Sequence, residues 1–439
     1  MIKVKTRNWL LLATPPSEWL GPDIRAFSSF RALLPYVSTR FDTVWINPRL
    51  LGLPVPRDNI SVFLRKLRAL TKVTAQTVTR EGYITLEPPI PYTEFYIAPI
   101  KSYDHIFINY WSIIAKTIVH RVENILKILK PKLCLSTHVF GGLLGDILKK
   151  RNLVEYHIYY DVDKFSTIPP FDVNVPTQIS CLENKIVQNA DIVWSVSRTL
   201  GNLRKSAGAR KVLTVPHGVN KGLFAKAVKL RKSKSTSSLE KTLSVVYTGT
   251  IHPNWGVDTL LQAFDILMKK GYKVRLILAG PATPALLKSI EALQRKYFDN
   301  IQYLGVIHWS KLYEVLAMGD VGVAPYKIEG SAIYGAPLKI KEYVAAGLPV
   351  ISSSIGEIQS FLQGNNVGIT CEPSAYELAK ALITLIEKPY LREKLAKNAL
   401  QLELPSWEQN FDIAFEETLK TLESHYKYQD NGKLSLING

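Results

Sequence analysis

The sequence predicts an α/β protein with two doubly wound parallel sheets, each covered by helices on both faces. Strand-like and helical runs alternate through both halves of the chain, and this alternation is typical of parallel sheets. The strand-like runs are continuously apolar, as in strands that are buried on both faces. The length of 439 residues exceeds one ordinary core and indicates two or three domains.

The first half contains the less regular series of these elements. The expected strands are "NWLLLAT", "DTVWINP", "KLCLST", "VEYHIYYD", "ADIVWSVS" and "KVLTVP", with helices at "IVHRVENILKILK" and "GLLGDILKKRN". Each strand-like run is rich in apolar residues and is bounded by polar or turn-forming ones. This half therefore forms the first parallel sheet.

The second half alternates strictly. Its expected strands are "LSVVYTG", "KVRLILAG", "IQYLGVI", "DVGVAPY", "LPVISSS" and "VGITCEP", separated by helices such as "WGVDTLLQAFDILMKKG", "PLKIKEYVAAG" and "AYELAKALITLIEK". Gly347 and Pro349 end one of these helices just before the next strand, because neither residue continues a helix well. These runs form the second parallel sheet.

The elements divide the chain into two domains and a tail. Residues 1–220 form the first domain and 243–405 the second, and the polar residues 221–242 are interpreted as a linker or exposed loop. Residues 406–428 form a C-terminal helix, which we expect to pack back on the first domain, and residues 429–439 are a tail. Because ligands bind at the carboxyl ends of parallel strands, we expect a cleft between the two domains.

Positive charge is concentrated in the first half. The net charge is +18; residues 1–220 contain 29 basic and 16 acidic residues, whereas residues 242–439 contain 19 and 20. A basic half indicates an anionic partner, which leaves nucleic acid, a phospholipid surface and a phosphorylated substrate open, with solvated lysines as the alternative. No apolar run is long enough to span a membrane, and the three separated cysteines favour a reducing compartment.

The stretch "YGAPLKIKEYVAAGLPVI" places charged residues at the start of a helix. Gly335 and Ala336 precede this helix, so its unpaired N–H groups and positive end can meet phosphate or sugar groups. Lys339 adds a positive charge, and Glu342, on the same face, can accept two hydrogen bonds from a ribose. The alternative is an ordinary surface ion pair between Lys339 and Glu342.

Five segments of the second half, in order, resemble the retaining nucleotide-sugar glycosyltransferases of the GT-B fold, often called glycosyltransferase family 4. They are "VPHGVNKGLF", "VVYTGTIHPNWGVDTLLQAF", "VRLILAGP", "IQYLGVIHWSKLYEVLAMGDVGVAPY" and "APLKIKEYVAAGLPVI". In the first half, "YYDVDKFS" and "CLENKIVQNADIVWSVSRTL" more loosely resemble enzymes that build cell-surface polysaccharides. The resemblance implies two Rossmann-like domains facing across a cleft and a metal-independent transferase.

The resemblance assigns Glu342 to the second, ribose-binding glutamate of the family's Glu-x7-Glu motif. The first glutamate falls at Tyr334, and Glu329 in the preceding loop is a candidate replacement. Where the family often has an Arg and a Lys that grip the diphosphate, this chain has Thr250 and Trp255.

The diphosphate charge would then fall to Lys339, Lys327 and the backbone N–H groups near Gly249 and Thr250. The nucleobase in such folds is recognised by backbone groups after a strand, here "GVIH" with Val306 at its centre. The neighbouring histidine is better interpreted as part of a loop than as a ligand.

Three residues of the first half are candidates for catalysis or for acceptor positioning. His138 follows the strand "KLCLST" and opens a helix, and it is either a polar group of the cleft or a structural histidine. Asp161 and Asp163 lie at a strand end on one side of an extended chain, where they either polarise an acceptor hydroxyl or cap a turn. No third ligand is spaced with them, so no metal site is expected.

A basic segment, residues 61–80, has apolar residues at near-helical spacing and carries Arg65, Lys66, Arg68 and Lys72. A basic amphipathic helix can lie on an anionic membrane surface, and the resemblance implies that use near lipid-linked sugars. The alternative is a core-packing helix with one solvated face.

We therefore expect a glycosyltransferase that moves a sugar, with retention, from a nucleotide sugar to a glycan or polyprenyl-linked acceptor. Its expected location is cytoplasmic, peripheral on the inner face of the membrane. No cofactor beyond the donor substrate is expected. No nucleic acid is expected as a partner, because no helix-turn-helix, zinc or RNA-binding pattern occurs. A GT-B scaffold without transferase activity, epimerase-like or an inactive partner subunit, remains the alternative.

Overall fold

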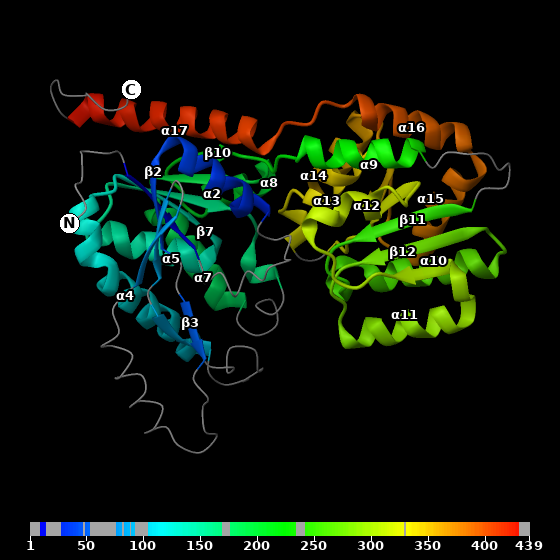
Figure 1. Cartoon of the computed structure of the whole chain (residues 1–439), viewed down its shortest axis with the longest axis horizontal. Coiled ribbons are helices and arrows are strands. Elements are labelled where there is room, and N and C mark those ends of the chain that lie inside the picture. The colour runs from blue at the N-terminus through cyan, green and yellow to red at the C-terminus, as the bar shows by residue number, and fades with distance from the viewer. Residues whose placement is uncertain are drawn as a thin grey trace, which may run out of the picture. The chain divides into compact units, whose positions relative to one another are not determined.

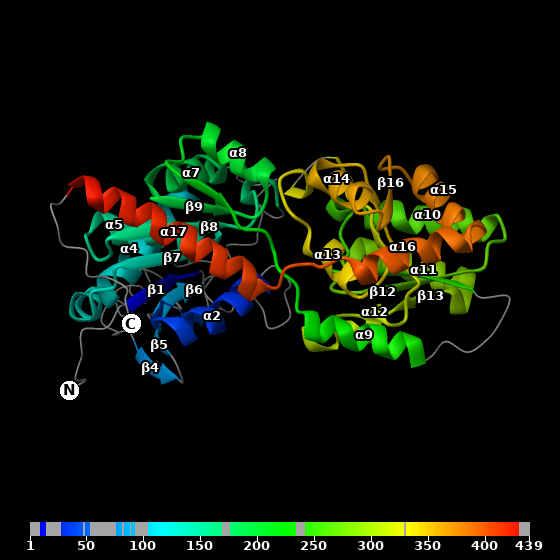
Figure 2. The same cartoon turned by 90° about the horizontal axis from the view of Figure 1, so that it is seen from above.

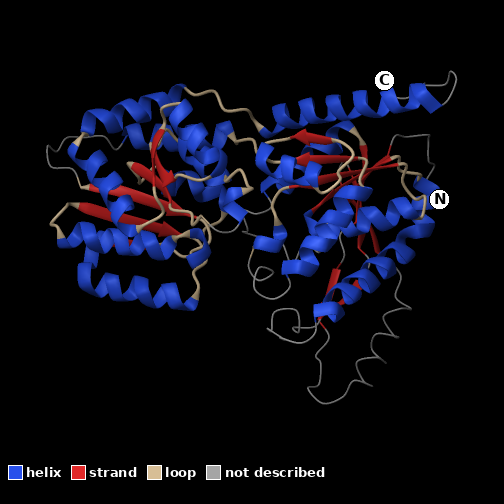
Figure 3. Cartoon of the chain, turned by 180° about the vertical axis from the view of Figure 1, so that it is seen from behind, coloured by secondary structure: helices blue, strands red, loops and turns tan. Residues whose placement is uncertain are grey.

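The computed structural model describes residues 9–14, 28–46, 49–52, 76–80, 83–87, 89–92, 104–168, 176–233, 242–328 and 331–429. These residues form two compact units (Figure 1). Unit 1 comprises the described residues up to Pro216 together with the C-terminal helix from Glu408, and unit 2 runs from His217 to Trp407. Each unit holds its own sheet among helices (Figure 3), so the predicted α/β class with two parallel sheets is confirmed.

Unit 1 is built around an eight-stranded sheet of order β10-β9-β8-β7-β1-β2-β5-β4, in which β4 alone is antiparallel to its neighbour. A separate pair, β3 and β6, is parallel. The elements of unit 1 are β1 (Trp9–Ala13), α2 (Ser28–Arg40), β2 (Asp42–Ile46), β3 (Arg49–Gly52), β4 (Gln76–Arg80), β5 (Tyr83–Glu87), β6 (Pro89–Tyr92), α4 (Asp104–Leu129), β7 (Leu133–Thr137), α5 (His138–Lys150), β8 (Tyr156–Asp161), the 3-10 turn η3 (Phe165–Thr167), α7 (Pro176–Asn189), β9 (Ile192–Ser195), α8 (Arg198–Ser206), β10 (Val212–Thr214) and α17 (Trp407–Gln429).

Helix α5 lies unusually close to the centre of this sheet. A Cβ atom at Gly141 would come within 2.5 Å of the carbonyl oxygen of Ala13, and one at Gly145 within 2.2 Å of the His157 ring. Only glycine permits such an approach of helix to strand. The close packing places the first residue of α5, His138, directly after the carboxyl end of β7.

Helix α17 is separated in sequence from the rest of unit 1 but packs against its sheet (Figure 2). The Phe415 ring lies edge-on to Trp194 of β9 at 4.9 Å, and the Phe411 ring lies 5.3 Å from Tyr36 of α2. The indole N–H of Trp194 donates a 2.9 Å hydrogen bond to Thr418. These buried aromatic contacts make the helix part of the core of unit 1.

Unit 2 is built around six parallel strands in the order β13-β12-β11-β14-β15-β16. This order reverses direction next to β11, which is where ligands bind in doubly wound sheets. Its elements are α9 (Lys221–Ser233), β11 (Leu243–Thr248), η4 (Pro253–Trp255), α10 (Val257–Lys269), β12 (Val274–Ala279), α11 (Pro284–Tyr297), η5 (Phe298–Asn300), β13 (Ile301–Tyr303), η6 (Trp309–Lys311), α12 (Leu312–Leu316), β14 (Val321–Ala324), η7 (Ser331–Ile333), α13 (Leu338–Ala345), β15 (Val350–Ser353), α14 (Gly356–Gly364), β16 (Gly368–Cys371), α15 (Ala375–Glu387) and α16 (Pro389–Gln401).

The two faces of the unit 2 sheet bury separate apolar cores. Val246 of β11 joins a core with α9, α12, α13 and α14, whereas its neighbours Val245 and Tyr247 join a core with α10, α11 and α15. Successive residues of a strand point to opposite faces, so both sets must be apolar. This explains why the strands appear as continuous apolar runs in the sequence.

The expected linker over residues 221–242 is wrong for its first part. Residues Lys221–Ser233 form helix α9, which packs on the sheet of unit 2 through Phe224 and Ala227. Arg231 donates hydrogen bonds to the carbonyl oxygens of Ala346 and Leu316 at 2.9 and 2.8 Å. It thereby binds orphan carbonyl groups at the ends of α13 and α12. The polar composition of this segment reflects a half-exposed helix.

All three cysteines are unpaired. Within the described part of the chain, no helix has the length and apolar character needed to cross a membrane.

Candidate functional site

The candidate site in unit 2 lies where helix α13 begins, after the carboxyl end of β14. Pro337 occupies the N-cap position and Leu338 is the first helical residue, so Gly335 and Ala336 precede the helix as the sequence suggested. The first N–H groups of a helix lack partners within it and carry partial positive charge. This end of α13 is therefore suited to an anion.

The side chain of Lys339 is held at this edge of the sheet by two tyrosines. Its Nζ donates a 3.0 Å hydrogen bond to the Tyr247 hydroxyl, and lies 4.4 and 5.0 Å from the ring centroids of Tyr247 and Tyr326. Tyr247 comes from β11 and Tyr326 from the segment after β14, so three elements meet at one ammonium group. Cation–π contacts stabilise the charge without neutralising it.

Glu342 differs from the expectation of a surface residue. Its side chain is buried, with a relative exposure of 6%. A solvent-exposed ion pair with Lys339 does not fit this position, and replacement of Glu342 would also disturb packing. Burying a carboxylate costs free energy unless hydrogen bonds or an opposite charge compensate it. This cost makes a specific role for Glu342 the better interpretation.

The glycine loop after β11 offers fewer donors than expected. The N–H of Gly249 donates to the carbonyl oxygen of Ala279 at 2.9 Å, so it is not available to a phosphate. The carbonyl oxygen of Thr250 accepts from the Tyr247 hydroxyl at 2.8 Å. Both contacts fix the loop beside Lys339.

The remaining predicted donor residues are placed less directly. Lys327 forms a 2.9 Å ion pair with Asp258 at the start of α10, so part of its charge is already neutralised. Val306 is exposed in the turn after β13, and Tyr334 is half-buried just before α13. Glu329 lies outside the described residues, as do Arg65, Lys66, Arg68 and Lys72 of the basic segment.

Two residues that the sequence analysis did not select brace the segment before α13. His217 Nδ1 lies 3.1 Å from the carbonyl oxygen of Ala336, and Lys341 Nζ donates to the His217 carbonyl oxygen at 2.7 Å. Burial lowers the pKa of Lys341 to about 8, and burial and the charge of Lys341 lower the pKa of His217 to about 3. Both residues could have been selected from the sequence, because His217 lies in the segment "VPHGVN" and Lys341 lies two residues from Lys339.

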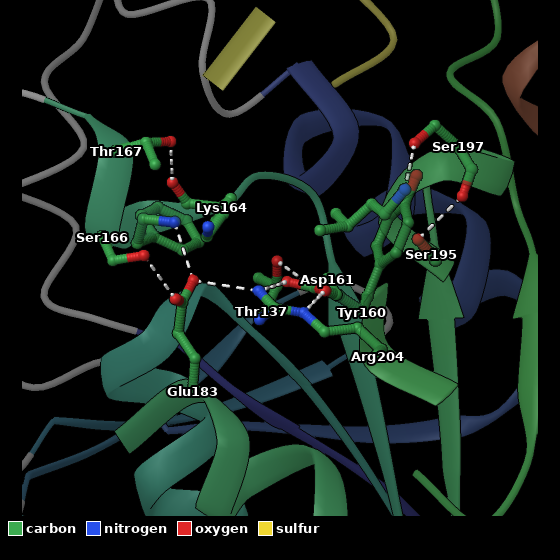
Figure 4. A network of polar contacts seen from close by, with 12 residues as sticks. Thr137, Tyr160, Asp161, Lys164, Ser166, Thr167, Glu183, Ser195, Ser197 and Arg204 are labelled. Atoms are coloured by element: carbon green, nitrogen blue, oxygen red, sulfur yellow. Dashed lines mark hydrogen bonds and ion pairs between the residues drawn. The ribbon is translucent and has the colours of Figure 1, made fainter. Parts of the chain in front are cut away.

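Unit 1 carries a second polar cluster, at the carboxyl end of β8 (Figure 4). Asp161 is fully buried and accepts from Arg204 Nε at 2.6 Å, and Arg204 Nη2 also donates to Glu183 at 2.9 Å. Burial raises the pKa of both carboxyl groups, and the Arg204 charge opposes that rise. Asp161 is therefore a structural ion-pair partner, which corrects the expectation that it contacts an acceptor.

Asp163 is placed differently from Asp161. It is half-buried, two residues beyond the strand end. Burial and the charges of Asp161 and Glu183 raise the pKa of Asp163 to about 7. A carboxyl group that titrates near neutral pH can exchange a proton under working conditions, so Asp163 keeps its place as a candidate catalytic residue.

Replacing Asp163 with asparagine is expected to change the pH dependence of stability. The folded state holds the Asp163 proton up to about pH 7, whereas the unfolded chain releases it near pH 4. The wild type therefore loses stability as the pH rises through that window, and Asp163→Asn should not. Melting temperatures at pH 5 and pH 8 should show the variant gaining on wild type at pH 8. The exposed Asp299→Asn control should run parallel to wild type, and parallel curves for Asp163→Asn would contradict the assignment.

His138 occupies a strained position between β7 and α5. Its φ is +64°, a conformation that costs a non-glycine residue energy and often marks a functional position. The Phe140 N–H donates to His138 Nδ1 at 3.2 Å, and the Phe165 ring lies 4.2 Å from the imidazole. Burial lowers the pKa of His138 to about 3. The ring is thus neutral near pH 7, with its proton on Nε2.

No group of three or more His, Cys, Asp and Glu side chains within the described ranges could hold a metal ion. Within the same ranges, Asp161 and Asp163 therefore do not belong to a group of side chains that could bind a metal ion.

Residues 242–388 match the protein family described as "Glycosyl transferases group 1". This part of the chain is similar to the group 1 glycosyl transferases. The domain contains α13, Lys339, Glu342 and the glycine loop, whereas His138 and Asp163 lie outside the matched range. The predicted resemblance to this family is confirmed for unit 2.

The curated relatives are distant and match only part of this chain. The chain is 27% identical over 161 residues to an alpha-D-kanosaminyltransferase of Streptomyces kanamyceticus, spanning 36% of this chain and 40% of the relative. It is 24% identical over 224 residues to the phosphatidylinositol N-acetylglucosaminyltransferase gpi3 subunit of Schizosaccharomyces pombe, spanning 51% and 45%. The chain thus spans less than half the length of these relatives.

The similarity in structure extends beyond the group 1 domain. A sucrose-phosphate synthase from Thermosynechococcus elongatus superimposes with a TM-score of 0.69 at 18% sequence identity, covering 95% of this chain and 100% of that one. The fold is GT-B. The facing of the two units across a cleft stays a prediction.

Proposed function

We propose that the chain is a glycosyltransferase that moves a sugar from a nucleotide sugar to a lipid-linked or cell-surface glycan acceptor, with retention and without a metal ion. The observation that carries the proposal is the start of α13 inside the group 1 domain. There the helix N-terminus, the Lys339 ammonium and the buried Glu342 carboxylate lie on one short segment.

The chemistry of the transfer matches these groups. Cleavage of the sugar–diphosphate bond develops negative charge on the diphosphate, which a prepositioned cation and helix N–H groups stabilise. Lys339 is such a cation, because its two tyrosine contacts fix its position. Glu342 can accept hydrogen bonds from the ribose hydroxyls. In a retaining transfer the leaving phosphate itself can take the acceptor proton.

In unit 1, His138 would serve as a neutral hydrogen-bond donor toward the transferred sugar. Because Nδ1 accepts from Phe140, the ring proton lies on Nε2, which is the donor that this role requires. Burial, which lowers the pKa of His138 to about 3, makes it a poor general base near neutral pH. Asp163 would position the acceptor and polarise its hydroxyl, whose proton passes to the leaving phosphate.

The acceptor and the location rest on sequence similarity. One relative is named for phosphatidylinositol, a lipid acceptor, and this supports work at a membrane. We place the enzyme in the cytoplasm, peripheral on the inner face of the membrane, with Arg65, Lys66, Arg68 and Lys72 as the contact.

The test is a panel of uridine, guanosine, adenosine and thymidine diphosphates added to wild type, Lys339→Met and Lys296→Met. A ligand at 100 times its dissociation constant stabilises the folded state by about 2.7 kcal/mol and raises the melting temperature. We expect one nucleotide to do so in wild type and in Lys296→Met, and the shift to be lost or strongly reduced in Lys339→Met. Lys296 is the matched control because it forms an ion pair with Asp265 on another helix.

The nucleotide that binds is then tested as its sugar conjugates with polyprenyl-phosphate and glycan acceptors. Release of nucleoside diphosphate that depends on acceptor, persists in EDTA and gives a product with the donor's anomeric configuration is the expected result. Binding without any release would favour a GT-B scaffold without transferase activity. No binding of any nucleotide would overturn the proposal.

A further inference from the structure

The first two residues of the 3-10 turn η3 in unit 1 are hydrogen-bonded to the buried cluster of Asp161, Glu183 and Arg204. The Phe165 N–H donates to Glu183 Oε1 at 2.7 Å, and the Ser166 hydroxyl donates to Glu183 Oε2 at 2.9 Å. One carboxylate of α7 thus holds the turn at two adjacent points. Hydrogen bonds to an ionised acceptor are about twice as strong as neutral ones.

Arg204 is the residue that allows this carboxylate to stay ionised. Its guanidinium, 1% exposed, donates to Glu183 and to Asp161, so it links α8 to α7 and to the end of β8. Figure 4 shows Arg204 between the two carboxylates, with Ser166 on the far side of Glu183. Without the guanidinium, burial would favour the protonated acids, which accept more weakly.

The 3-10 turn η3 carries Phe165, whose ring covers His138. Phe165 is buried and its ring centroid lies 4.2 Å from that of the imidazole. The Phe140 N–H holds the imidazole at Nδ1, and packing against the face of the ring restricts its tilt. Phe165 provides that packing.

We propose that Glu183 and Arg204 are positioning residues for His138, acting through the Phe165 ring. The path runs from Arg204 to Glu183, from Glu183 to the backbone of Phe165, and from Phe165 to the imidazole. The inference rests on the proposed function for its catalytic meaning, since it takes His138 to face the sugar. The structural part stands on the contacts alone.

Histidine NMR tests the structural part directly. In 15N-histidine-labelled wild type, with His138→Gln for assignment, we expect His138 to keep a single tautomer with Nε2 protonated and to stay neutral down to pH 5. In Phe165→Ala and in Glu183→Gln we expect mixed tautomers and titration of His138 closer to the ordinary pKa of about 6.5. Phe165→Tyr should restore the wild-type signals.

Two features keep this test decisive. Ser166→Ala is the matched control, because it removes one hydrogen bond to Glu183 but leaves the Phe165 N–H bond in place, and its His138 signals should match wild type. Should Glu183→Gln fail to fold, Phe165→Ala still tests the last contact of the path. Unchanged His138 signals in every folded variant of Phe165 and Glu183 would overturn the proposal.

Steady-state kinetics then tests the catalytic part. Phe165→Ala is expected to lower kcat at least ~10-fold with a smaller change in the KM of the donor, because a small misplacement of a reacting group costs rate. Phe165→Tyr should recover most of the rate. A wild type without transferase activity would refute the proposed function while the NMR result stands, and a perturbed His138 with unchanged kcat would refute only its catalytic role.

Discussion

Replacing Arg204 with methionine is expected to lower the free energy of unfolding of unit 1 by about 3–5 kcal/mol, the usual effect of removing one partner from a buried ion pair. Asp161 and Glu183, both 0% exposed, would lose their only cation among the contacts described for them. Hydrogen exchange of peptides from β8 and α7 during urea titration measures the effect in unit 1 separately from unit 2.

The matched control for this change is Arg210→Met. Arg210 also pairs with an aspartate, Asp191 at 3.6 Å, but its side chain is 62% exposed. Exposed ion pairs contribute about 0–1 kcal/mol, so this variant should unfold close to wild type. Adding Asp161→Asn and Glu183→Gln to Arg204→Met should recover part of the loss, because no buried charge then remains unpaired in the cluster. Equal effects of Arg204→Met and Arg210→Met would contradict the assigned role.

Replacing Gly256 with alanine is expected to destabilise unit 2 and to disturb the site at α13. Gly256 has a φ of +72°, and a Cβ there would lie 1.6 Å from the carbonyl oxygen of Pro325. The left-handed backbone costs about 1–2 kcal/mol for any L-residue, and the overlap adds a further ~1–3 kcal/mol as the chain moves apart. Because Tyr326 follows Pro325 and lies against Lys339, the displacement should also weaken nucleotide binding.

Gly271→Ala separates the two contributions. Gly271 has a similar φ of +79°, but a Cβ there would meet nothing within 4 Å. This variant should lose only the backbone share and should retain the melting-temperature shift on adding the nucleotide that binds wild type. Identical losses of melting temperature in the two alanine variants would show that the Pro325 contact can be relieved at little cost.

The parallel sheets were predictable because their signal is local and strong. The six strands of unit 2 appear as apolar runs separated by helical periodicity, and both faces of β11 are buried by different cores. Helix α9 was missed because basic residues recur along its whole length and mask the inward-packing residues Leu223, Phe224, Ala227 and Leu230. The helical interpretation of residues 61–80 is wrong for Gln76–Arg80, which form the antiparallel edge strand β4, because a short strand at the end of a basic segment gives no signal of its own.

The site was predictable in its position but not in its contacts. A glycine followed by Pro-x-Lys-x-x-Glu after an apolar run indicates a helix start at a strand end, and Lys339 is indeed placed there. The burial of Glu342, the engagement of the Gly249 N–H and the pairing of Asp161 with Arg204 depend on residues distant in sequence. Partners 43 residues apart, such as Asp161 and Arg204, leave no pattern in a single sequence.

The membership of α17 in unit 1 has a consequence for how the protein is made. The sheet of unit 1 emerges from the ribosome before unit 2, yet the aromatic surface of Tyr36 and Trp194 is covered by the last helix. At ordinary translation rates, synthesis of His217–Trp407 takes roughly 10–40 seconds. During that interval the apolar surface around Tyr36 and Trp194 is exposed in the nascent first half. We expect chaperones to bind this surface until α17 is synthesised and packs on it.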